Sequence, residues 1–100
     1  MQLITKIAGY QHKAGAAELL AARVKTGMRL TLVPEPTNKY DKFAVRVQLG
    51  DQLLGYVPRE RSEAVSRLIG YGVEMTCRKS HHGFNAIELE WSSQERDPLA

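Results

Sequence analysis

One hundred residues are enough for one small domain, and 43% hydrophobic and 25% charged residues are the proportions of an ordinary globular protein. The net charge of +3 permits a polyanionic partner without requiring one, and Cys77, the single cysteine, excludes an internal disulfide and favours a reducing, cytoplasmic setting. No apolar stretch reaches the roughly 20 residues of a membrane span, and the first residues lack the apolar stretch of a signal peptide.

The first third of the chain predicts a strand, a helix and a second strand. Residues 2–10 alternate loosely between apolar and polar side chains, which is typical of a strand. Residues 14–24 change to a helical period that Gly27 ends, and residues 28–32 alternate again. The two prolines that follow hold the chain extended and exclude a central strand there. The apolar face of the helix consists of Ala17, Leu20, Ala21 and Val24.

The middle of the chain predicts a hairpin. Residues 43–49 show the most regular alternation in the sequence, with Val45 and Val47 expected to point inward. The Gly50-Asp51 pair that follows is typical of a tight turn. We therefore expect residues 52–57 to return as the partner strand.

A second helix and two more strands are expected in the last third. Pro58 suits the first turn of a helix over residues 59–69, and two glycines follow that helix. Residues 73–77 and 85–91 then alternate as strands. The polar segment 92–100 is expected to be a disordered tail.

This order of elements predicts an α+β, mainly β fold in one domain over residues 1–91. Two short helices cannot cover a flat sheet of six strands, whereas a small, partly closed barrel of the OB type buries one face of every strand. We therefore expect an OB-like, six-stranded, partly closed barrel with two short helices. Its core is predicted to contain Ile7, Leu20, Val24, Leu30, Leu32, Val45, Val47, Leu53, Val65, Leu68, Val73, Ile87 and Leu89.

Two segments carry the most specific pattern in the sequence. The first, LVPEPTNKYDKFAVRV, covers residues 32–47, and the second, LGYVPRE, covers residues 54–60. Together with IAGY at residues 7–10, they resemble the HIRAN family, whose pattern is a strand ending in glycine, then L-x-x-E-P-x-N-x-Y-D-x-x-A-[IV]-x-V, then [IV]-G-Y-[IV]-P. The resemblance runs over residues 3–72 in the order and spacing of the family.

The resemblance implies an OB-like nucleic-acid-binding module that is not an enzyme. Members of the family stand at the N-terminus of SWI/SNF-type remodelling ATPases, and others occur alone or with nuclease-like domains. A helicase or nuclease partner chain is therefore implied as well. The best-understood member captures the 3′-hydroxyl end of single-stranded DNA at stalled replication forks, which implies the same ligand here, in DNA repair or fork processing.

The resemblance also implies where the DNA would bind. Tyr40 matches the aromatic residue on which a base stacks, and Asp41 matches the acid that contacts the terminal hydroxyl. Asn38 and Lys42 fall in the same pocket loop. The chemistry of these residues agrees with that assignment, because single strands bind to basic grooves with exposed aromatic faces.

Further DNA contacts are expected around this loop. Arg59 matches a phosphate contact, and Tyr56 matches a pocket position that varies between aromatic residues and histidine. Gln11 and His12 depart from the family, because the DNA-end binder has an Arg-Tyr pair there. Independently of the resemblance, Arg46 adds positive charge to the same face, and Lys42, Arg46 and Arg59 are expected to gather near Tyr40.

Each of these residues also has a purely structural interpretation. The tyrosines could close the end of the barrel or belong to its core, and the basic side chains could simply be solvated. Asn38 is a common turn former, and Asp41 could cap the turn before Phe43 or pair with a neighbouring lysine. Glu35, between two prolines, is assigned to structure.

The sequence offers no pattern for a cofactor, metal or catalytic site. His12, Cys77, His81 and His82 lack C-x-x-C or H-x-x-x-H spacing, so we expect no metal site and expect Cys77 to pack as a small apolar group. Phosphate-binding GxxxxGK[ST] loops, GxSxG elbows and paired catalytic carboxylates are also missing.

Two classes of function remain open from the sequence. The first is a module that binds single-stranded DNA, and the second is a protein-interaction adaptor on the same barrel. A targeting fragment of a larger enzyme is a third reading. Salt separates the first two, because neutralising phosphates releases counterions and makes DNA binding strongly salt-dependent.

Overall fold

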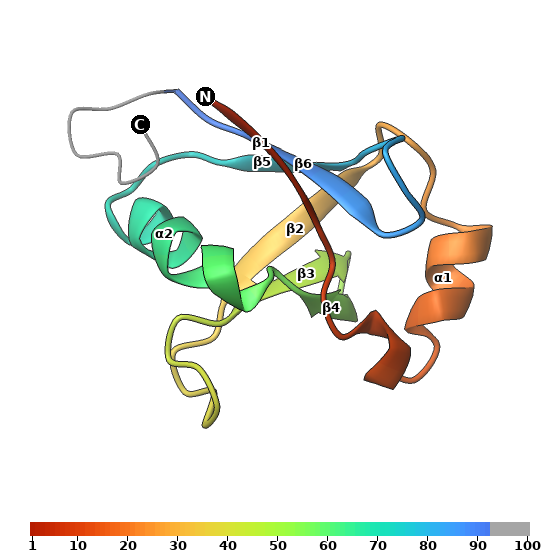
Figure 1. Cartoon of the computed structure of the whole chain (residues 1–100), viewed down its shortest axis with the longest axis horizontal. Coiled ribbons are helices and arrows are strands. Elements are labelled where there is room, and N and C mark those ends of the chain that lie inside the picture. Colours follow the sequence, from red (N-terminus) through yellow and green to blue (C-terminus); the bar gives the residue numbers. More distant parts are fainter. Residues whose placement is uncertain (93–100) are drawn as a thin grey trace.

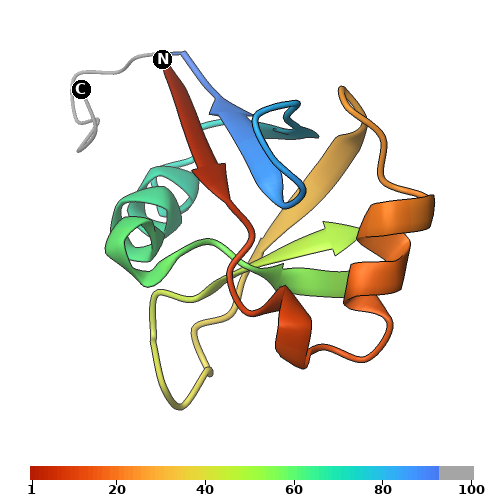
Figure 2. The same ribbon diagram turned by 45° about the vertical axis from the view of Figure 1, so that its right-hand side comes forward.

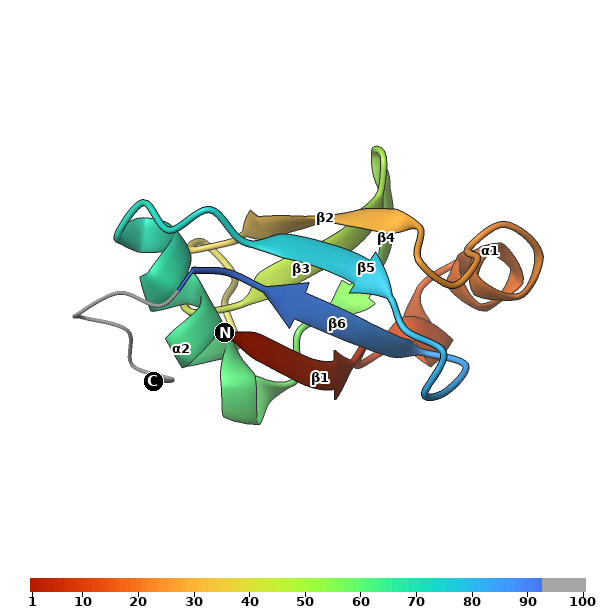
Figure 3. The ribbon, with the colours of Figure 1, turned by 90° about the horizontal axis from the view of Figure 1, so that it is seen from above.

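Six antiparallel strands form one curled sheet in the computed structural model, which describes residues 1–92 (Figure 1). The strands follow one another across the sheet in the order β1-β6-β5-β2-β3-β4. Figure 3 shows β1, β6, β5 and β2 side by side, with α1 and α2 at opposite ends of the molecule. The strands are β1 (Gln2–Lys6), β2 (Arg29–Pro34), β3 (Val45–Leu49), β4 (Gln52–Tyr56), β5 (Thr76–Lys79) and β6 (Ala86–Glu90). The helices are the 3-10 helix η1 (Tyr10–His12), α1 (Ala16–Ala22) and α2 (Arg59–Gly70).

A bridge between the two outer strands closes one end of this sheet. The chain leaves β1 and reaches Ala8, whose N–H donates to the Tyr56 carbonyl at 2.7 Å, while the Tyr56 N–H donates to the Ala8 carbonyl at 2.9 Å. Because β1 and β4 are the outer strands, this pairing joins the two edges at one point. The expected OB-like, partly closed barrel with two helices is therefore confirmed.

Gly55 makes this closure possible. A Cβ atom at Gly55 would stand 2.5 Å from the Ala8 carbonyl oxygen and 2.5 Å from Cγ2 of Ile7, closer than real Cβ atoms come. Only a residue without a side chain allows the backbone of β4 to approach the chain after β1 this closely.

The core inside the barrel contains most of the residues predicted for it. Val45 and Val47 are inaccessible to solvent while Arg46 between them is partly exposed, which confirms the register of β3. Leu32 is only half-buried at the edge of the core. Buried hydrophobic residues outside this list are Ala16, Ala44, Leu54, Val57, Ala86 and Trp91, together with Cys77, whose burial was expected separately.

The prediction that Leu53 is buried was wrong because β4 contains a bulge. Val47 pairs with Gly55 and Gln48 pairs with Leu53, so Leu54 is an extra residue in β4. An extra residue shifts the alternation by one, and here it turns Leu54 inward and leaves Leu53 half-exposed.

Several predicted segments have different bounds in the structure. The central strand β2 continues to Pro34, so the expectation that the prolines exclude a central strand there was wrong. Pro34 is tolerated because it pairs with Val45 of β3 beyond the part of β2 that pairs with β5, which is Arg29 and Leu30, so its missing N–H costs no bond to β5.

The first strand ends at Lys6 and not at residue 10, because Gly9 takes a left-handed conformation (φ 74°) and the chain turns into η1. The first helix begins only at Ala16, and this start buries Ala16 with Leu20 one turn later while Ala21 stays exposed. The fifth strand begins at Thr76, three residues after the predicted start.

The predictions for the second helix and for Cys77 are confirmed, whereas the predicted tail lies almost entirely outside the described residues. The second helix matches its prediction to within one residue, and Cys77 is buried as expected. Burial raises the pKa of the Cys77 thiol to about 12, so the thiol stays protonated at neutral pH. Within residues 1–92, no helix is both long and apolar enough to span a membrane. Apart from Ser92, the tail predicted over residues 92–100 lies outside the described residues.

Candidate nucleic-acid interface

A hollow of about 640 Å³ lies beside the bridge that closes the barrel, and we call it the first hollow. Three parts of the chain line it: the segment between β1 and η1 together with Lys13, the loop that joins β2 to β3, and the end of β4 with the start of α2. Five of the predicted site residues lie among its lining residues, namely Asn38, Tyr40, Asp41, Tyr56 and Arg59.

Side chains within the β2–β3 loop hold its backbone in place. The Asn38 amide oxygen accepts hydrogen bonds from the N–H groups of Tyr40 (2.9 Å) and Asp41 (3.0 Å). Asp41 in turn accepts the Phe43 N–H at 2.9 Å through Oδ1 and the hydroxyl of buried Ser62 at 2.8 Å through Oδ2. The loop is thus fixed within itself and to α2, and Asp41 is the turn cap that its position before Phe43 suggested.

Tyr40 stands out from this fixed loop. Its side chain is 76% exposed, and the Lys39 ammonium lies 5.7 Å from the centre of its ring. The Arg59 guanidinium donates to the Tyr40 carbonyl at 2.6 Å and links the loop to the start of α2. An exposed aromatic face on a fixed backbone, with cations beside it, is suited to stacking on a base.

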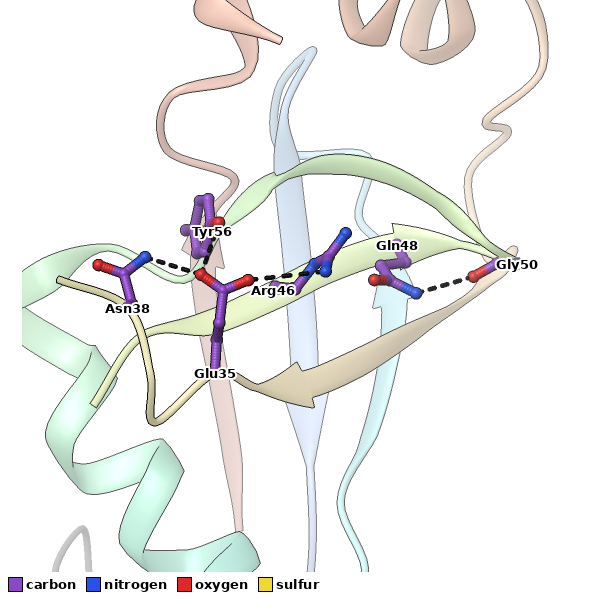
Figure 4. A network of polar contacts seen from close by, with 6 residues as sticks. All are labelled: Glu35, Asn38, Arg46, Gln48, Gly50 and Tyr56. Carbon is purple, nitrogen blue, oxygen red and sulfur yellow. Dashed lines mark hydrogen bonds and ion pairs between the residues drawn. The ribbon is translucent and has the colours of Figure 1, made fainter. Parts of the chain in front are cut away.

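Glu35 joins three parts of the site through its carboxylate (Figure 4). Oε1 accepts hydrogen bonds from the Asn38 amide at 2.8 Å and the Tyr56 hydroxyl at 3.0 Å, and Oε2 pairs with Arg46 at 3.6 Å. Burial raises the pKa of the Tyr56 hydroxyl, and its hydrogen bond to Glu35 raises this pKa further, so Tyr56 remains a neutral donor. Glu35 is structural as expected, but it also lines the first hollow.

Lys13 is a lining residue that the sequence reasoning missed. Its ammonium lies 5.3 Å from the centre of the Tyr56 ring, and it lines the first hollow together with residues of the β2–β3 loop. The only signal for it in the sequence is its place directly after Gln11-His12, the pair that departs from the family pattern. The early turn at Gly9 brings Lys13 back to β4.

Charges of both signs therefore line the first hollow. Lys13, Lys39 and Arg59 are cations that suit phosphate groups, and Glu35 and Asp41 are carboxylates that suit hydroxyl or amine donors. Within residues 1–92, no group of three histidine, cysteine or acidic side chains is placed to hold a metal ion.

Four predicted site residues lie around the first hollow and not in its lining. The Lys42 ammonium lies 5.2 Å from the centre of the Phe43 ring, and Arg46 pairs with Glu35. Gln11 and His12 are exposed on η1. Of the three cations expected near Tyr40, Arg59 is the one that contacts it.

The family model of the HIRAN domain matches residues 2–94. The chain belongs to the HIRAN family. The HIRAN family is known for nucleic-acid binding, and HIRAN is a binding domain and not a catalytic one.

Two solved structures share the fold of this HIRAN domain. The HIRAN domain of human HLTF superposes with a TM-score of 0.76 at 16% identity, over 96% of this chain and 78% of that one. A protein from Lactobacillus plantarum superposes with a TM-score of 0.71 at 21% identity, over 89% of this chain and 91% of that one. No curated protein matches the sequence.

The Glu35 network leads to a testable prediction about stability. We expect Glu35→Gln to lower the free energy of unfolding by about 1 kcal/mol, because a glutamine amide faces Arg46 with a donor or a weaker acceptor. Arg46 already has a buried Nε without a hydrogen-bond partner in the described part of the chain, so loss of its counter-ion leaves it less satisfied. Urea unfolding measures the change. Glu63→Gln, which removes the exposed ion pair with Arg67, is the matched control and should leave the midpoint unchanged.

Proposed function

We propose that this HIRAN domain binds single-stranded DNA at its 3′-hydroxyl end through the first hollow, in DNA repair or replication-fork processing. The observation that carries the proposal is the exposed ring of Tyr40, held on a fixed loop between cations and the carboxylate of Asp41. The domain would bind without catalysing a reaction and would serve a helicase or nuclease partner chain. Its single thiol favours the cytoplasm.

The lining residues divide the work of recognition between them. Tyr40 stacks on the terminal base, and Lys39, Arg59 and Lys13 neutralise phosphates of the strand. Asp41 accepts a hydrogen bond from the 3′-hydroxyl, because a carboxylate has about four acceptor positions and its two oxygens use one each in the free domain.

The other predicted site residues support DNA binding without the direct contacts assigned above. Asn38 keeps Tyr40 and Asp41 in place through its amide oxygen, and Tyr56 forms part of the floor of the first hollow. Lys42 and Arg46 add to the positive field around it, with Gln11 and His12 beyond Lys13. A protein adaptor would use the same tyrosines without needing this set of cations.

Oligonucleotide binding measured by fluorescence anisotropy tests the proposal. We expect a single-stranded oligonucleotide to bind more tightly than its duplex, with an affinity that falls steeply as salt rises, because each neutralised phosphate contributes about −0.7 to the logarithmic salt slope. Weak salt dependence would favour the adaptor, and equal binding of the blunt duplex would contradict recognition of a single-strand end.

Substitution of Tyr40 gives a sharper measurement of the same site. Tyr40→Ala should weaken single-strand binding about fivefold, the lower end of the ~1–3 kcal/mol that base stacking on an aromatic ring contributes, because the ring is open to solvent. Tyr71→Ala, a tyrosine that is 48% exposed after the end of α2, is the matched control and should bind as the wild type does. Equal losses in both variants would remove Tyr40 from the site.

A further inference from the structure

The first hollow does not end at Lys13. A second hollow of about 450 Å³ is lined by His12, Lys13, Leu19 and Gln52, among others. A third hollow of about 630 Å³ is lined by Leu19, Gln52, Arg23, Lys25 and Asp51, among others. Lys13 lines both the first and the second hollow, and Leu19 and Gln52 line both the second and the third. The three hollows therefore adjoin one another in a row, which we call the β4 track.

The path of the β4 track follows from the topology of the sheet. Strand β4 is an outer strand, and within residues 1–92 its outer edge pairs with the chain after β1 at Tyr56 alone. Beyond that bridge, η1 and α1 pack along β4, and the tip of the β3–β4 hairpin lies beside α1 (Figure 2). The β4 track runs between β4 on one side and η1 and α1 on the other. It extends from Tyr56 to the turn before Gln52. Five residues of strand make its length roughly 16 Å.

Three basic side chains line the β4 track. Lys13 stands where the first hollow meets the second, and Arg23 and Lys25 line the third. Within residues 1–92, the salt bridges are Arg46–Glu35 and Arg67–Glu63, so these three cations have no carboxylate partner there. Asp51 is the acidic residue that lines the third hollow.

The first hollow is too small for the length of single strand that a domain of this type occupies. A cavity of about 640 Å³ holds a ligand of drug size, which corresponds to about one or two nucleotides. Domains of the OB type occupy roughly 4–16 nucleotides of a single strand. A strand that enters the first hollow must therefore leave it over another part of the surface.

We propose that a strand whose terminal nucleotide occupies the first hollow continues along the β4 track. Its sugar–phosphate backbone passes Lys13 in the second hollow and reaches Arg23 and Lys25 at the third. Arg23 and Lys25 are thus a second phosphate-binding position, separate from the end-binding residues. This inference rests on the proposed function, because it assumes that the first hollow takes the strand end.

Oligonucleotides of increasing length test the inference on the whole chain. We expect the affinity of the wild type to rise at least fivefold between a 3′-hydroxyl thymidine dinucleotide and an octanucleotide, measured by anisotropy. The Arg23→Ala/Lys25→Ala variant should bind the dinucleotide as the wild type does and lose most of the gain with length. Its salt slope for the octanucleotide should fall by about 1.4, because two single-strand phosphate contacts are removed.

A matched variant separates this effect from a change in net charge. Arg29→Ala/Arg78→Ala removes two exposed cations from paired positions on β2 and β5, outside the β4 track. We expect this control to keep the gain with length. The inference is overturned if Arg23→Ala/Lys25→Ala keeps that gain, or if both double variants lose it equally. Absence of binding to any oligonucleotide would overturn the proposed function itself, and the β4 track with it.

Discussion

An oligonucleotide that ends in a 3′-phosphate should bind at least tenfold more weakly than the same oligonucleotide with a 3′-hydroxyl. The first hollow contains two carboxylates, Glu35 and Asp41, and Asp41 belongs to the loop that carries Tyr40. A hydroxyl donates a hydrogen bond to a carboxylate, whereas a phosphate at neutral pH has no suitable proton and carries the same sign of charge. The loss of that donor contributes ~1–3 kcal/mol, and repulsion adds to it.

The position of the phosphate and the identity of residue 41 are the controls for this prediction. A 5′-phosphate should leave the affinity unchanged, because that end lies away from the first hollow. Asp41→Asn should reduce the tenfold discrimination to less than about threefold, because an amide oxygen still accepts but no longer repels. The turn should survive, because the amide can accept the Phe43 N–H and donate to the Ser62 hydroxyl.

Competition anisotropy with the two 3′ ends measures this discrimination directly. Asp51→Asn, which changes an acid outside the first hollow, should keep the full discrimination. Equal binding of 3′-hydroxyl and 3′-phosphate strands would show that Asp41 is only a turn cap. The domain would then bind single strands without regard to their ends, and Gln11-His12 would be the first positions to examine for the lost specificity.

Gly55→Ala should destabilise the domain by about 3 kcal/mol, at the upper end of what one extra methyl group does in a packed interior. Its Cβ would meet the Ala8 carbonyl oxygen and Ile7 at 2.5 Å, and the carbonyl belongs to backbone that cannot rotate away. Relief requires that β4 and the chain after β1 move apart, which breaks the two hydrogen bonds between Ala8 and Tyr56.

Thermal and urea unfolding measure this loss, and Gly70 supplies the control. Gly70 is the last residue of α2 and has open space where its Cβ would lie, so Gly70→Ala should leave stability unchanged or raise it slightly. Because Tyr56 and Ala8 both line the first hollow, Gly55→Ala should also weaken single-strand binding at temperatures where it remains folded. A Gly55→Ala variant as stable as the wild type would mean that the barrel closes differently.

The motif in residues 35–47 predicted much of the site because its chemistry is local. Asn38 and Asp41 bond to backbone groups two or three residues away, so their turn-forming role can be expected from their spacing alone. The bond from the Tyr56 hydroxyl to Glu35 joins residues 21 positions apart, and no spacing rule indicates it. The contacts that Glu35 makes with Asn38, Tyr56 and Arg46 therefore become visible only in the folded chain.

The sequence by itself determined the order of the elements, the OB-like class, the second helix and most of the core. These properties follow from the periods of apolar residues and from the glycines and prolines that end helices and strands. Both signals act over a few neighbouring residues. The tertiary structure alone decided the bulge that buries Leu54 in place of Leu53, the closure at Gly55, and the position of Lys13 over Tyr56. Each of these depends on how two distant segments meet, and a hydrophobic pattern fixes which face of a strand is buried but not which backbone will lie against it.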